Sequence, residues 1–405
     1  MKAAMLVWAL VLTFSLPALS QNQNPVQLPE GPAKEIMEAK CVSCHELERV
    51  ARRDGNTPAG WQMILNNMVT LGAQVTPEEV QVMHEYLSTN FPNTAPVPVL
   101  VPGPVEVTIR EWDVPTPGSR PHDPLVARDG TIWYAGINAS ILGHFDPETE
   151  RFGEYKLKAN TGPHGLIDDA EGNIWFTGQH GHYMGKLDPK TGFVTEYPLS
   201  HPDGRSPHTP IVAPNGDVFF TTSGGNMLGR ISAKTGEMTM VRQAPNPYGI
   251  QLNSEGIPFI TLNGTNKLGR LDPVTMEVTE YELPHPDTRP RRLAITSDDA
   301  IWYGDYTRGY LGRYDPKTGE HKEWATPSGP DSRIYGIAQF NDIIWYNESG
   351  VRPNTIVRFD PKTETFQSWA IPSGGGVVRH MMPDKEGNIW LAESGVNKIG
   401  VVEVR

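Results

Sequence analysis

The chain has 405 residues, which is too long for one ordinary hydrophobic core, so we expect two domains or one small domain joined to a repeat architecture. Its 40 glycines and 37 prolines favour a turn-rich β structure. The 35 basic and 47 acidic residues give a formal charge of −12 without blocks of like charge, which argues against nucleic acid or an anionic membrane as a partner.

The N-terminus has the pattern of a secretory signal. Lys2 is followed by the apolar run 3–16, then by Pro17 and the small-residue pattern of residues 18–20. An uncleaved anchor is the alternative, but the run is shorter than the ~20 apolar residues that a membrane span needs. We therefore expect residues 1–20 to be removed on export to the periplasm, leaving no membrane span.

The two cysteines lie in the sequence Cys41-Val42-Ser43-Cys44-His45, the attachment pattern of c-type haem. The spacing suits two thiols that add to the vinyl groups of haem, with the imidazole of His45 beneath the iron as proximal ligand. A thioredoxin-like redox pair or a chance match is the alternative, and a redox pair would need a βαβ context that is not visible. The pattern predicts one covalent haem c held by Cys41, Cys44 and His45.

The surroundings of this motif, residues 26–92, are helical. Pro32 opens a helix that leads into the cysteines, and Pro58 starts a second. A third begins with the capping box of residues 76–79, which has proline at the first helical position. The three helices predict a small all-α cytochrome c domain.

The sixth iron ligand has several candidates, because Met63, Met68, Met83 and His84 could all reach the same pocket. Met68 is favoured because residues 71–73 break its helix directly afterwards and let the chain turn around the haem edge. Met83, His84 or an open site are the alternatives. The choice matters since axial ligands shift haem potentials over roughly 0.8 V.

This domain resembles the haem domains of quinohaemoprotein amine dehydrogenases. The resemblance rests on the cysteine–histidine motif, Trp61, the stretch from Asn67-Met68 to Gly72-Ala73, and residues 85–87. It implies electron transfer with Met68 as iron ligand. It does not imply amine oxidation, because the quinone-bearing partner is absent.

Prolines in residues 93–106 predict an extended, semi-rigid linker. From residue 107 to 405 one unit of several short strands recurs with a spacing of 40 to 45 residues, which predicts the blades of an all-β propeller. Seven central aromatic residues indicate seven blades. They are Trp133, Trp175, Phe219, Phe259, Trp302, Trp345 and Trp390.

The way the propeller closes can also be predicted. The last repeat lacks an outer strand, whereas an unmatched copy of that strand, residues 107–112, precedes the first repeat. The N-terminal strand should therefore complete the seventh blade and leave no open sheet edge.

One polar position enters the innermost strand of each blade, ten or eleven residues before the central aromatic. In a propeller these positions surround the mouth of the central channel, so hydrogen-bonding and titratable side chains there indicate a ligand site. A solvated channel without a ligand is the alternative. The predicted ring consists of His122, His164, His208, Tyr248, Arg291, Tyr335 and His380.

A second set of positions lies three residues after the central aromatic. On the later blades these are Asp305, Glu348 and Glu393, of which we assign Glu348 to the channel-mouth ligand site. Imidazoles beside carboxylates suit general acid–base chemistry or a weakly held divalent ion such as Mg²⁺.

The propeller closely resembles the virginiamycin B lyase (streptogramin lyase) family. The shared signature includes Pro163-His164-Gly165, residues 171–177, residues 187–189 and residues 397–400. The resemblance implies Mg²⁺-assisted elimination that opens a cyclic depsipeptide.

The catalytic positions of that family are only partly conserved. His380 and Glu393 match its catalytic histidine and glutamate in the last blade, whereas Val396 stands where a further histidine belongs. Val378 and Tyr335 replace a second acidic residue and another histidine.

These patterns predict a periplasmic haem electron-transfer protein whose propeller binds a small-molecule substrate or a redox partner protein, as in an oxidoreductase. Elimination moves no net electrons, so a haem would be idle in a lyase. Two alternatives are a Mg²⁺-dependent streptogramin-type lyase acting on this or another ester, and a non-catalytic docking module of a redox complex.

Overall fold

The computed structural model describes residues 28–42, 47, 55–70, 72–242 and 245–405. The predicted signal segment, Cys44 and His45 lie outside the described residues. Within the described ranges, every helix is too short or too polar to cross a bilayer.

Three α-helices of the described residues form a unit at the N-terminal end: α1 (Lys34–Lys40), α3 (Pro58–Thr70) and α4 (Pro77–Asn90). The first begins two residues after the proline expected to open it. The predicted capping box of α4 is present, because the Thr76 hydroxyl accepts from the backbone N–H of Glu79 and the Glu79 carboxylate accepts from that of Thr76. Gly72, at φ +101°, adopts the left-handed backbone that lets the chain turn after α3.

The helical unit has its own apolar core. Trp61 and Leu65 of α3 pack with Met83 and Leu87 of α4 and with Met37 of α1. The indole N–H of Trp61 donates to the carbonyl oxygen of Phe91, 2.8 Å away, which ties the end of α4 to α3.

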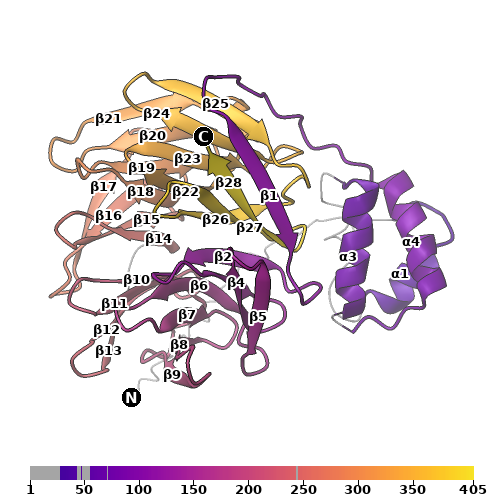
Figure 1. Cartoon of the computed structure of the whole chain (residues 1–405), viewed down its shortest axis with the longest axis horizontal. Helices are drawn as coiled ribbons and strands as arrows, with labels where there is room; N and C mark the ends of the chain where they lie inside the picture. Colours follow the sequence, from indigo (N-terminus) through magenta and orange to yellow (C-terminus); the bar gives the residue numbers. More distant parts are fainter. Residues whose placement is uncertain (1–27, 43–46, 48–54, 71, 243–244) are drawn as a thin grey trace, which may run out of the picture.

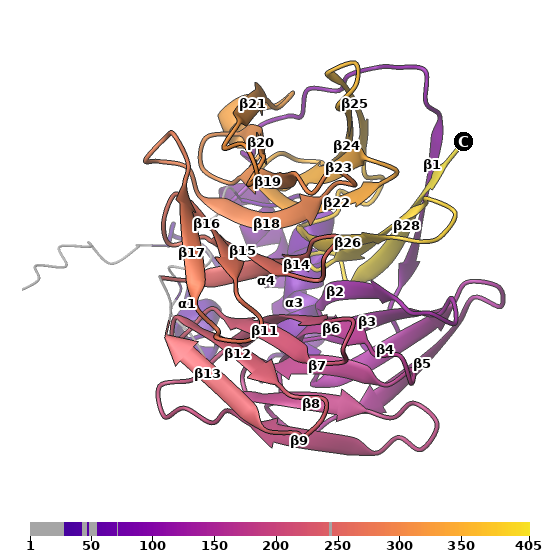
Figure 2. The same cartoon turned by 90° about the vertical axis from the view of Figure 1, so that its left-hand side faces the viewer.

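The rest of the chain forms seven four-stranded antiparallel sheets arranged around a centre (Figures 1 and 2). The strands of each blade are given from the innermost outward. The first blade consists of β2 (Pro121–Val126), β3 (Ile132–Gly136), β4 (Ile141–Asp146) and β5 (Arg151–Lys156), and the second of β6 (Pro163–Asp168), β7 (Ile174–Gly178), β8 (Tyr183–Leu187) and β9 (Val194–Pro198). The third consists of β10 (Pro207–Val212), β11 (Val218–Thr222), β12 (Met227–Ile231) and β13 (Met238–Arg242), and the fourth of β14 (Pro247–Leu252), β15 (Pro258–Leu262), β16 (Lys267–Leu271) and β17 (Val278–Glu282).

The remaining three blades follow the same order. Their strands are β18 (Pro290–Ile295), β19 (Ile301–Asp305), β20 (Tyr310–Tyr314), β21 (His321–Ala325); β22 (Ile334–Phe340), β23 (Ile343–Glu348), β24 (Thr355–Asp360), β25 (Thr365–Ala370); and β26 (Val378–Pro383), β27 (Ile389–Glu393), β28 (Lys398–Val404), β1 (Val107–Asp113). A short 3-10 helix, η1 (Gly329–Asp331), precedes β22.

The predicted closure is confirmed. Strand β1 pairs antiparallel with β28, Val107 opposite Val404 and Asp113 opposite Lys398, so the seventh sheet has the order β1-β28-β27-β26. Joining the two ends of the propeller in one sheet leaves its ring without an open edge.

The repeated residues of the blades build turns and packing between sheets. In the Asp-Pro hairpins, Asp188 accepts from the backbone N–H of Lys190, and Asp272 accepts from that of Val274. The second strands β3, β7, β11, β15, β19 and β27 are buried along their whole length, so their aromatic residues form the core between blades.

The linker is fixed to the propeller. Its backbone runs beside β25 of the sixth blade, where Val101 and Ser368 exchange hydrogen bonds of 2.9 Å and the Gln367 side chain bonds to the backbone of Val105. The backbone N–H of Arg352 donates to the carbonyl of Pro96. Docking along a blade restricts the helical unit more strongly than an extended spacer would.

The helical unit lies over one face of the propeller. It stands beside the blades in Figure 1, with α3 toward them, and behind their centre in Figure 2. The contact is close at Gly118, where an added Cβ would stand 3.1 Å from the side-chain oxygen of Asn67 on α3. Gly118 precedes β2 by three residues, so the unit covers the face where the innermost strands begin.

Candidate functional site

The second residues of the seven innermost strands gather at this face of the propeller. A bulge or register shift follows the first residue of each of these strands. The members of this channel ring are His122, His164, His208, Tyr248, Arg291, Tyr335 and Arg379.

The seventh member differs from the sequence prediction. Val378 is the first residue of β26 and pairs with Glu393, as Pro121 of β2 pairs with Gly136, so Arg379 and not His380 is equivalent to His122. Eleven residues separate Arg379 from its central aromatic, as in five of the other blades. The spacing of eleven that six of the seven blades share identifies Arg379, whereas Tyr335 stands ten residues before its aromatic.

One side of the ring is a row of three buried imidazoles. The ring centroids of His122 and His164 are 3.6 Å apart, and those of His164 and His208 are 4.0 Å apart. His122 Nδ1 donates to Asp123 (2.8 Å) and His164 Nδ1 donates to the carbonyl oxygen of His208 (3.1 Å). In the neutral tautomer these bonds leave Nε2 of both rings as an acceptor.

Burial keeps these imidazoles neutral. Loss of hydration lowers the pKa of His122, His164 and His208 well below the usual value, and the positive charges of nearby arginines and of the other imidazoles lower it further. Three uncharged histidines therefore form this wall at neutral pH.

The opposite side of the ring consists of tyrosine and arginine. The hydroxyls of Tyr248 and Tyr335 lie 2.7 Å apart, and Arg291 donates to Tyr248. The Arg291 guanidinium lies 3.8 Å from the ring centre of Tyr335 and 4.4 Å from that of Tyr306. Arg379 donates to the Tyr335 hydroxyl at 3.1 Å. Cation–π and hydrogen-bond contacts thus hold both guanidiniums in place.

The hydroxyls of Tyr248 and Tyr335 have different pKa values because of these charges. Burial raises the pKa of Tyr335, but the guanidiniums of Arg291, Arg379 and Arg292 outweigh burial and lower it to about 7. Burial and the neighbouring Tyr335 raise the pKa of Tyr248. Tyr335 is therefore the acidic member of the pair.

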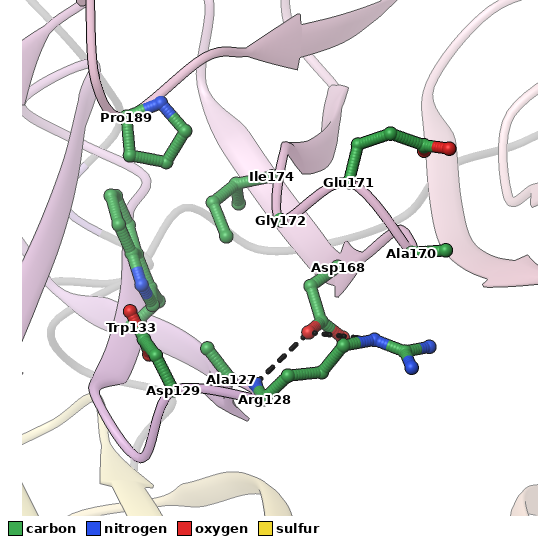
Figure 3. Close-up of a pocket in the computed structure, with 10 residues that line it drawn as sticks. All are labelled: Ala127, Arg128, Asp129, Trp133, Asp168, Ala170, Glu171, Gly172, Ile174 and Pro189. Carbon is green, nitrogen blue, oxygen red and sulfur yellow. Dashed lines mark hydrogen bonds and ion pairs between the residues drawn. The ribbon is translucent and has the colours of Figure 1, made fainter.

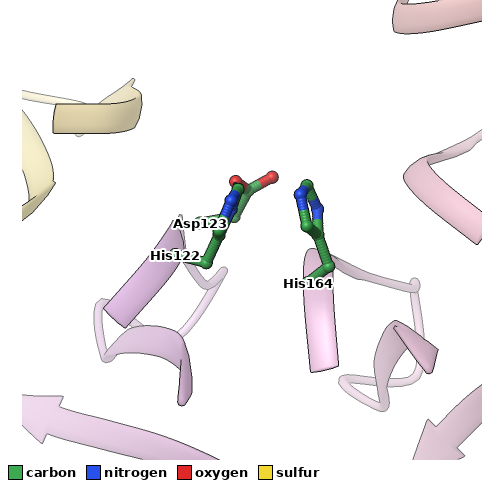
Figure 4. A group of neighbouring side chains, drawn as sticks. All are labelled: His122, Asp123 and His164. Carbon is green, nitrogen blue, oxygen red and sulfur yellow. The ribbon is translucent and has the colours of Figure 1, made fainter. Parts of the chain in front are cut away.

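An ion pair between Asp123 and Arg292 crosses the channel. Each of these residues directly follows the ring member of its own strand. Arg292 donates to Asp123 at 2.7 Å, and both side chains are 2 % exposed. The same oxygen accepts from His122. Asp123, His122 and His164 lie close together (Figure 4) and offer ligand atoms within 4.8 Å of one another. Sequence reasoning missed this pair because its partners are 169 residues apart.

A cavity of about 270 Å³ opens between the two sides of the ring. Its walls include all three imidazoles, the two tyrosines and Arg379, and Arg120 and His180 extend them toward the face covered by the helical unit. The predicted positions His122, His164, His208, Tyr248 and Tyr335 thus share one cavity, and Arg291 lies against its tyrosines.

The acidic residues that end the second strands have structural partners. Glu348 is fully buried and accepts hydrogen bonds from Ser328 and Thr355. Asp305 accepts from the backbone N–H groups of Arg289 and Thr307. Neither is among the residues that form the walls of the channel cavity.

Glu393 is buried beside a second carboxyl group. It accepts from Ser373 at 3.2 Å and lies against Glu111 of β1. Burial, followed by the contact with Glu111, raises the pKa of Glu393 well above its usual value. The protonated acid is therefore favoured in the fold.

His380, the other predicted catalytic residue, is half-buried on β26. Its Nδ1 atom is buried and has no hydrogen-bond partner in the described part of the chain. Burial lowers the pKa of His380 to about 3. A catalytic role for His380 and Glu393 remains a prediction.

The described part of the sequence predicted to attach haem lies at the end of α1. Cys41 caps this helix, its backbone N–H donating to Met37, and its side chain packs against the helical core. Met68 is half-buried on α3, next to the residue that contacts Gly118. Met83 is buried in the core, and His84 bonds to the carbonyl oxygen of Pro58. The sixth iron ligand therefore stays a prediction.

A second cavity, of about 190 Å³, lies between the first two blades (Figure 3). It is formed by the turns that follow β2 and β6, at the opposite ends of these strands from His122 and His164. Asp168 accepts there from the backbone of Arg128, a contact that fixes the turn. We assign no function to it.

Comparison with protein families identifies the propeller. The family model described as the virginiamycin B lyase family matches residues 104–245 and 233–405. Comparison with the sequences of characterised proteins gave no match.

Solved structures agree with this match. A streptogramin B lyase is 28% identical, with a TM-score of 0.67 over 74% of this chain and 98% of its own. A catalytically inactive virginiamycin B lyase from Staphylococcus aureus with quinupristin is 26% identical, with a TM-score of 0.67 over 74% of this chain and 99% of its own. Hydrazine synthase from Kuenenia stuttgartiensis, at 13% identity, shares the fold over 70% of this chain and 96% of its own, with a TM-score of 0.62.

Proposed function

The chain belongs to the virginiamycin B lyase family, and from its haem-attachment sequence we propose that it is an exported, periplasmic c-type cytochrome whose propeller binds a substrate or redox partner. Cys41, Cys44 and His45 would hold the haem, which would supply electron transfer to or from a ligand at the channel mouth. The observation that carries this proposal is the fusion of Cys41-Val42-Ser43-Cys44-His45 to a propeller with a polar, arginine-rich cavity.

The position of the helical unit supports the proposal. Asn67 precedes the favoured iron ligand Met68 and contacts Gly118, and Arg120, two residues later, belongs to the cavity wall. Residues 118–120 thus connect the helix that carries the expected iron ligand with the wall of the cavity that is expected to hold the ligand. The docked linker keeps them together.

The residues of the helical unit suit a covalently held haem. Cys41 lies at the C-terminal end of α1 beside an apolar core. Met68 is half-buried near the C-terminal end of α3. When bound, a haem with histidine and methionine ligands supplies one-electron transfer at a comparatively high potential. The protein's part is to hold it in an apolar setting and to keep a partner within reach.

The test uses the full chain produced with c-type maturation. The proposal predicts a covalent haem whose reduced spectrum is low-spin, and loss of the sixth ligand in Met68→Ala. Met63→Ala, on the same helix, is the matched control and should keep the wild-type spectrum. A protein that binds no haem after maturation would overturn the proposal. An unchanged spectrum in Met68→Ala would overturn the ligand assignment.

A streptogramin-type lyase is the second candidate, favoured by the family match and by the similarity to streptogramin B lyase over nearly all of that chain. Two observations weigh against it. Val396 cannot transfer a proton, and Glu393 lies against Glu111 in a setting that favours its protonated form. It could hold Mg²⁺ only after losing that proton.

Cleavage of a cyclic depsipeptide, with and without EDTA, tests the lyase. Metal-dependent turnover that is lost in Glu393→Gln and kept in Glu403→Gln would establish this reaction and displace electron transfer as the propeller's function. We expect no turnover. If the protein instead co-purifies with a redox enzyme and has no activity alone, the propeller is a docking module.

A further inference from the structure

The channel mouth carries an excess of positive charge. Arg292, Arg379 and Arg120 lie near enough to His122 to lower the pKa of its imidazole, and Arg291 lies against the tyrosines of the cavity. Arg292 is paired with the carboxylate of Asp123, whereas Arg291 and Arg379 donate to tyrosine hydroxyls. The imidazoles are neutral, and an ionised Tyr335 offsets one of these charges, so Asp123 and Tyr335 together balance two of the guanidiniums.

The guanidiniums also have unused hydrogen-bonding capacity. The Nε–H groups of Arg291, Arg292 and Arg379 are buried, and none has an acceptor among the residues that the structure describes. Arg291 donates to the Tyr248 hydroxyl, and Arg379 donates to the Tyr335 hydroxyl. Buried charged donors without anionic acceptors are costly, so a fold that retains them indicates that an acceptor comes from outside.

We propose that the channel mouth binds a small oxyanion, or the carboxylate or phosphate group of a larger ligand, in the cavity beside Arg379 and Tyr335. Arg291 and Arg292 stand behind this position and supply further positive charge. Guanidinium groups bind carboxylate and phosphate oxygens by charge-assisted, paired hydrogen bonds. The three neutral imidazoles belong to the wall of the same cavity, so a ligand with a hydrogen-bond donor beside its anionic end would suit it.

A cation is the competing ligand, because His122, Asp123 and His164 are close enough to share one. Asp123 already accepts hydrogen bonds from Arg292 and His122. Of the three residues that could bind a cation, only the two imidazoles then have no ion pair with an arginine. A metal ion there would face the guanidinium of Arg292. The charge balance therefore favours an anion.

The anion site extends the proposed function, because it gives the chemical class of the ligand that the propeller would hold near the haem. It can be tested separately because binding of an anion does not require a haem readout. Isothermal calorimetry on the full chain would use inorganic phosphate and acetate as probes, at low and at raised NaCl. We expect at least one of them to bind, with an affinity that falls as salt screens the arginines.

Arg379→Gln should weaken binding of that probe about tenfold to a hundredfold, the usual effect of losing one charge-assisted contact. Arg242→Gln is the matched control: it removes the same charge from an exposed ion pair with Asp203 on a distant blade and should leave binding unchanged. Arg379→Lys should restore part of the affinity. If Arg379→Gln proves unstable, Tyr335→Phe provides the second variant and should remove the dependence of binding on pH between about 7 and 9.

The outcomes separate the two proposals. Equal affinity in wild type and Arg379→Gln, or no heat with either anion, overturns the anion site whatever the haem does. Anion binding that needs Arg379 but leaves the haem potential unchanged keeps the anion site and rejects the coupling. Binding of Zn²⁺ or Cu²⁺ that is lost in His164→Gln, together with no anion binding, would assign the cavity to a cation instead.

Discussion

Asn67 of helix α3 packs against Gly118, at the point where the propeller chain enters the first innermost strand. Gly118 has φ +69°, a conformation that favours glycine, and an added Cβ would stand 3.1 Å from the Asn67 side chain. The helical unit and the channel ring are therefore joined by a contact that one substitution can disturb.

Gly118→Val should separate the two units. It combines backbone strain of about 1–3 kcal/mol with a clash against Asn67. Gly130→Val is the matched control, because Gly130 has φ +88° but nothing within 4 Å of its Cβ position. We expect both variants to lower the melting temperature, and only Gly118→Val to increase hydrogen exchange at the end of α3. Equal exchange in both variants would mean that the contact does not hold the unit.

Tyr335 should make the protein more stable in mild alkali. It is faced by neighbours from every adjacent strand, namely Tyr248 of β14, Arg291 and Arg292 of β18, Tyr306 after β19 and Arg379 of β26. Because its folded pKa is lowered to about 7 from an ordinary value near 10, the unfolded chain binds more protons between these values, and stability rises with pH there.

We expect the free energy of unfolding, measured by urea denaturation, to rise by about 1–3 kcal/mol from pH 7 to pH 9.5. The rise should be absent in Tyr335→Phe, and wild type should show tyrosinate absorbance near neutral pH. An identical pH profile in both proteins contradicts the assignment.

The imidazole row should make the fold sensitive to acid. Burial lowers the pKa of His122, His164 and His208, so below about pH 6.5 the unfolded chain takes up protons that the fold excludes. Stability should fall as pH drops from 6.5 to 5. His164→Gln should reduce this slope, whereas replacement of the partly exposed His201 should not. If His164→Gln leaves the dependence of stability on pH unaltered, the imidazoles of the row take up protons in the folded protein as readily as in the unfolded chain.

The carboxyl group of Glu393 is fully buried against the half-buried Glu111, and its effect on stability has the opposite sign. The pKa of Glu393 is raised, so the fold binds more protons than the unfolded chain above pH 4.5, and stability is lost as the pH rises from there. Glu111→Gln should stabilise the protein at pH 7 by about 1 kcal/mol. Glu403→Gln, on the adjacent strand β28 and partly exposed, should have little effect. Destabilisation by Glu111→Gln would indicate a bound cation between the two carboxylates.

Much of the architecture follows from local pattern. The seven aromatic positions and the unmatched copy of the outer strand were sufficient to predict the blades and their closure through β1, because each blade repeats the same local pairing. The helix starts at Pro58 and Thr76 follow from capping chemistry that involves only neighbouring residues.

The site is less accessible to such reasoning. A bulge after the first residue of β26 decides that Arg379 enters the ring while His380 follows it, and one residue of register changes which side chain reaches the cavity. The ion pair of Asp123 with Arg292 and the docking of the linker on Gln367 join distant segments, so no local pattern predicts them. The partners of Glu348 and Glu393 belong to neighbouring loops and strands, which the spacing of carboxylates does not reveal.

The most direct measurement is the potential of the haem in the full chain, titrated with and without the anion that calorimetry identifies, in wild type and in Arg379→Gln. We expect a wild-type shift of tens of millivolts, about 59 mV for each tenfold difference in anion affinity between the oxidised and reduced protein. Arg379→Gln should show no shift at the same anion concentration. Identical potentials with and without anion in wild type, at saturation, would contradict the coupling of cytochrome and propeller.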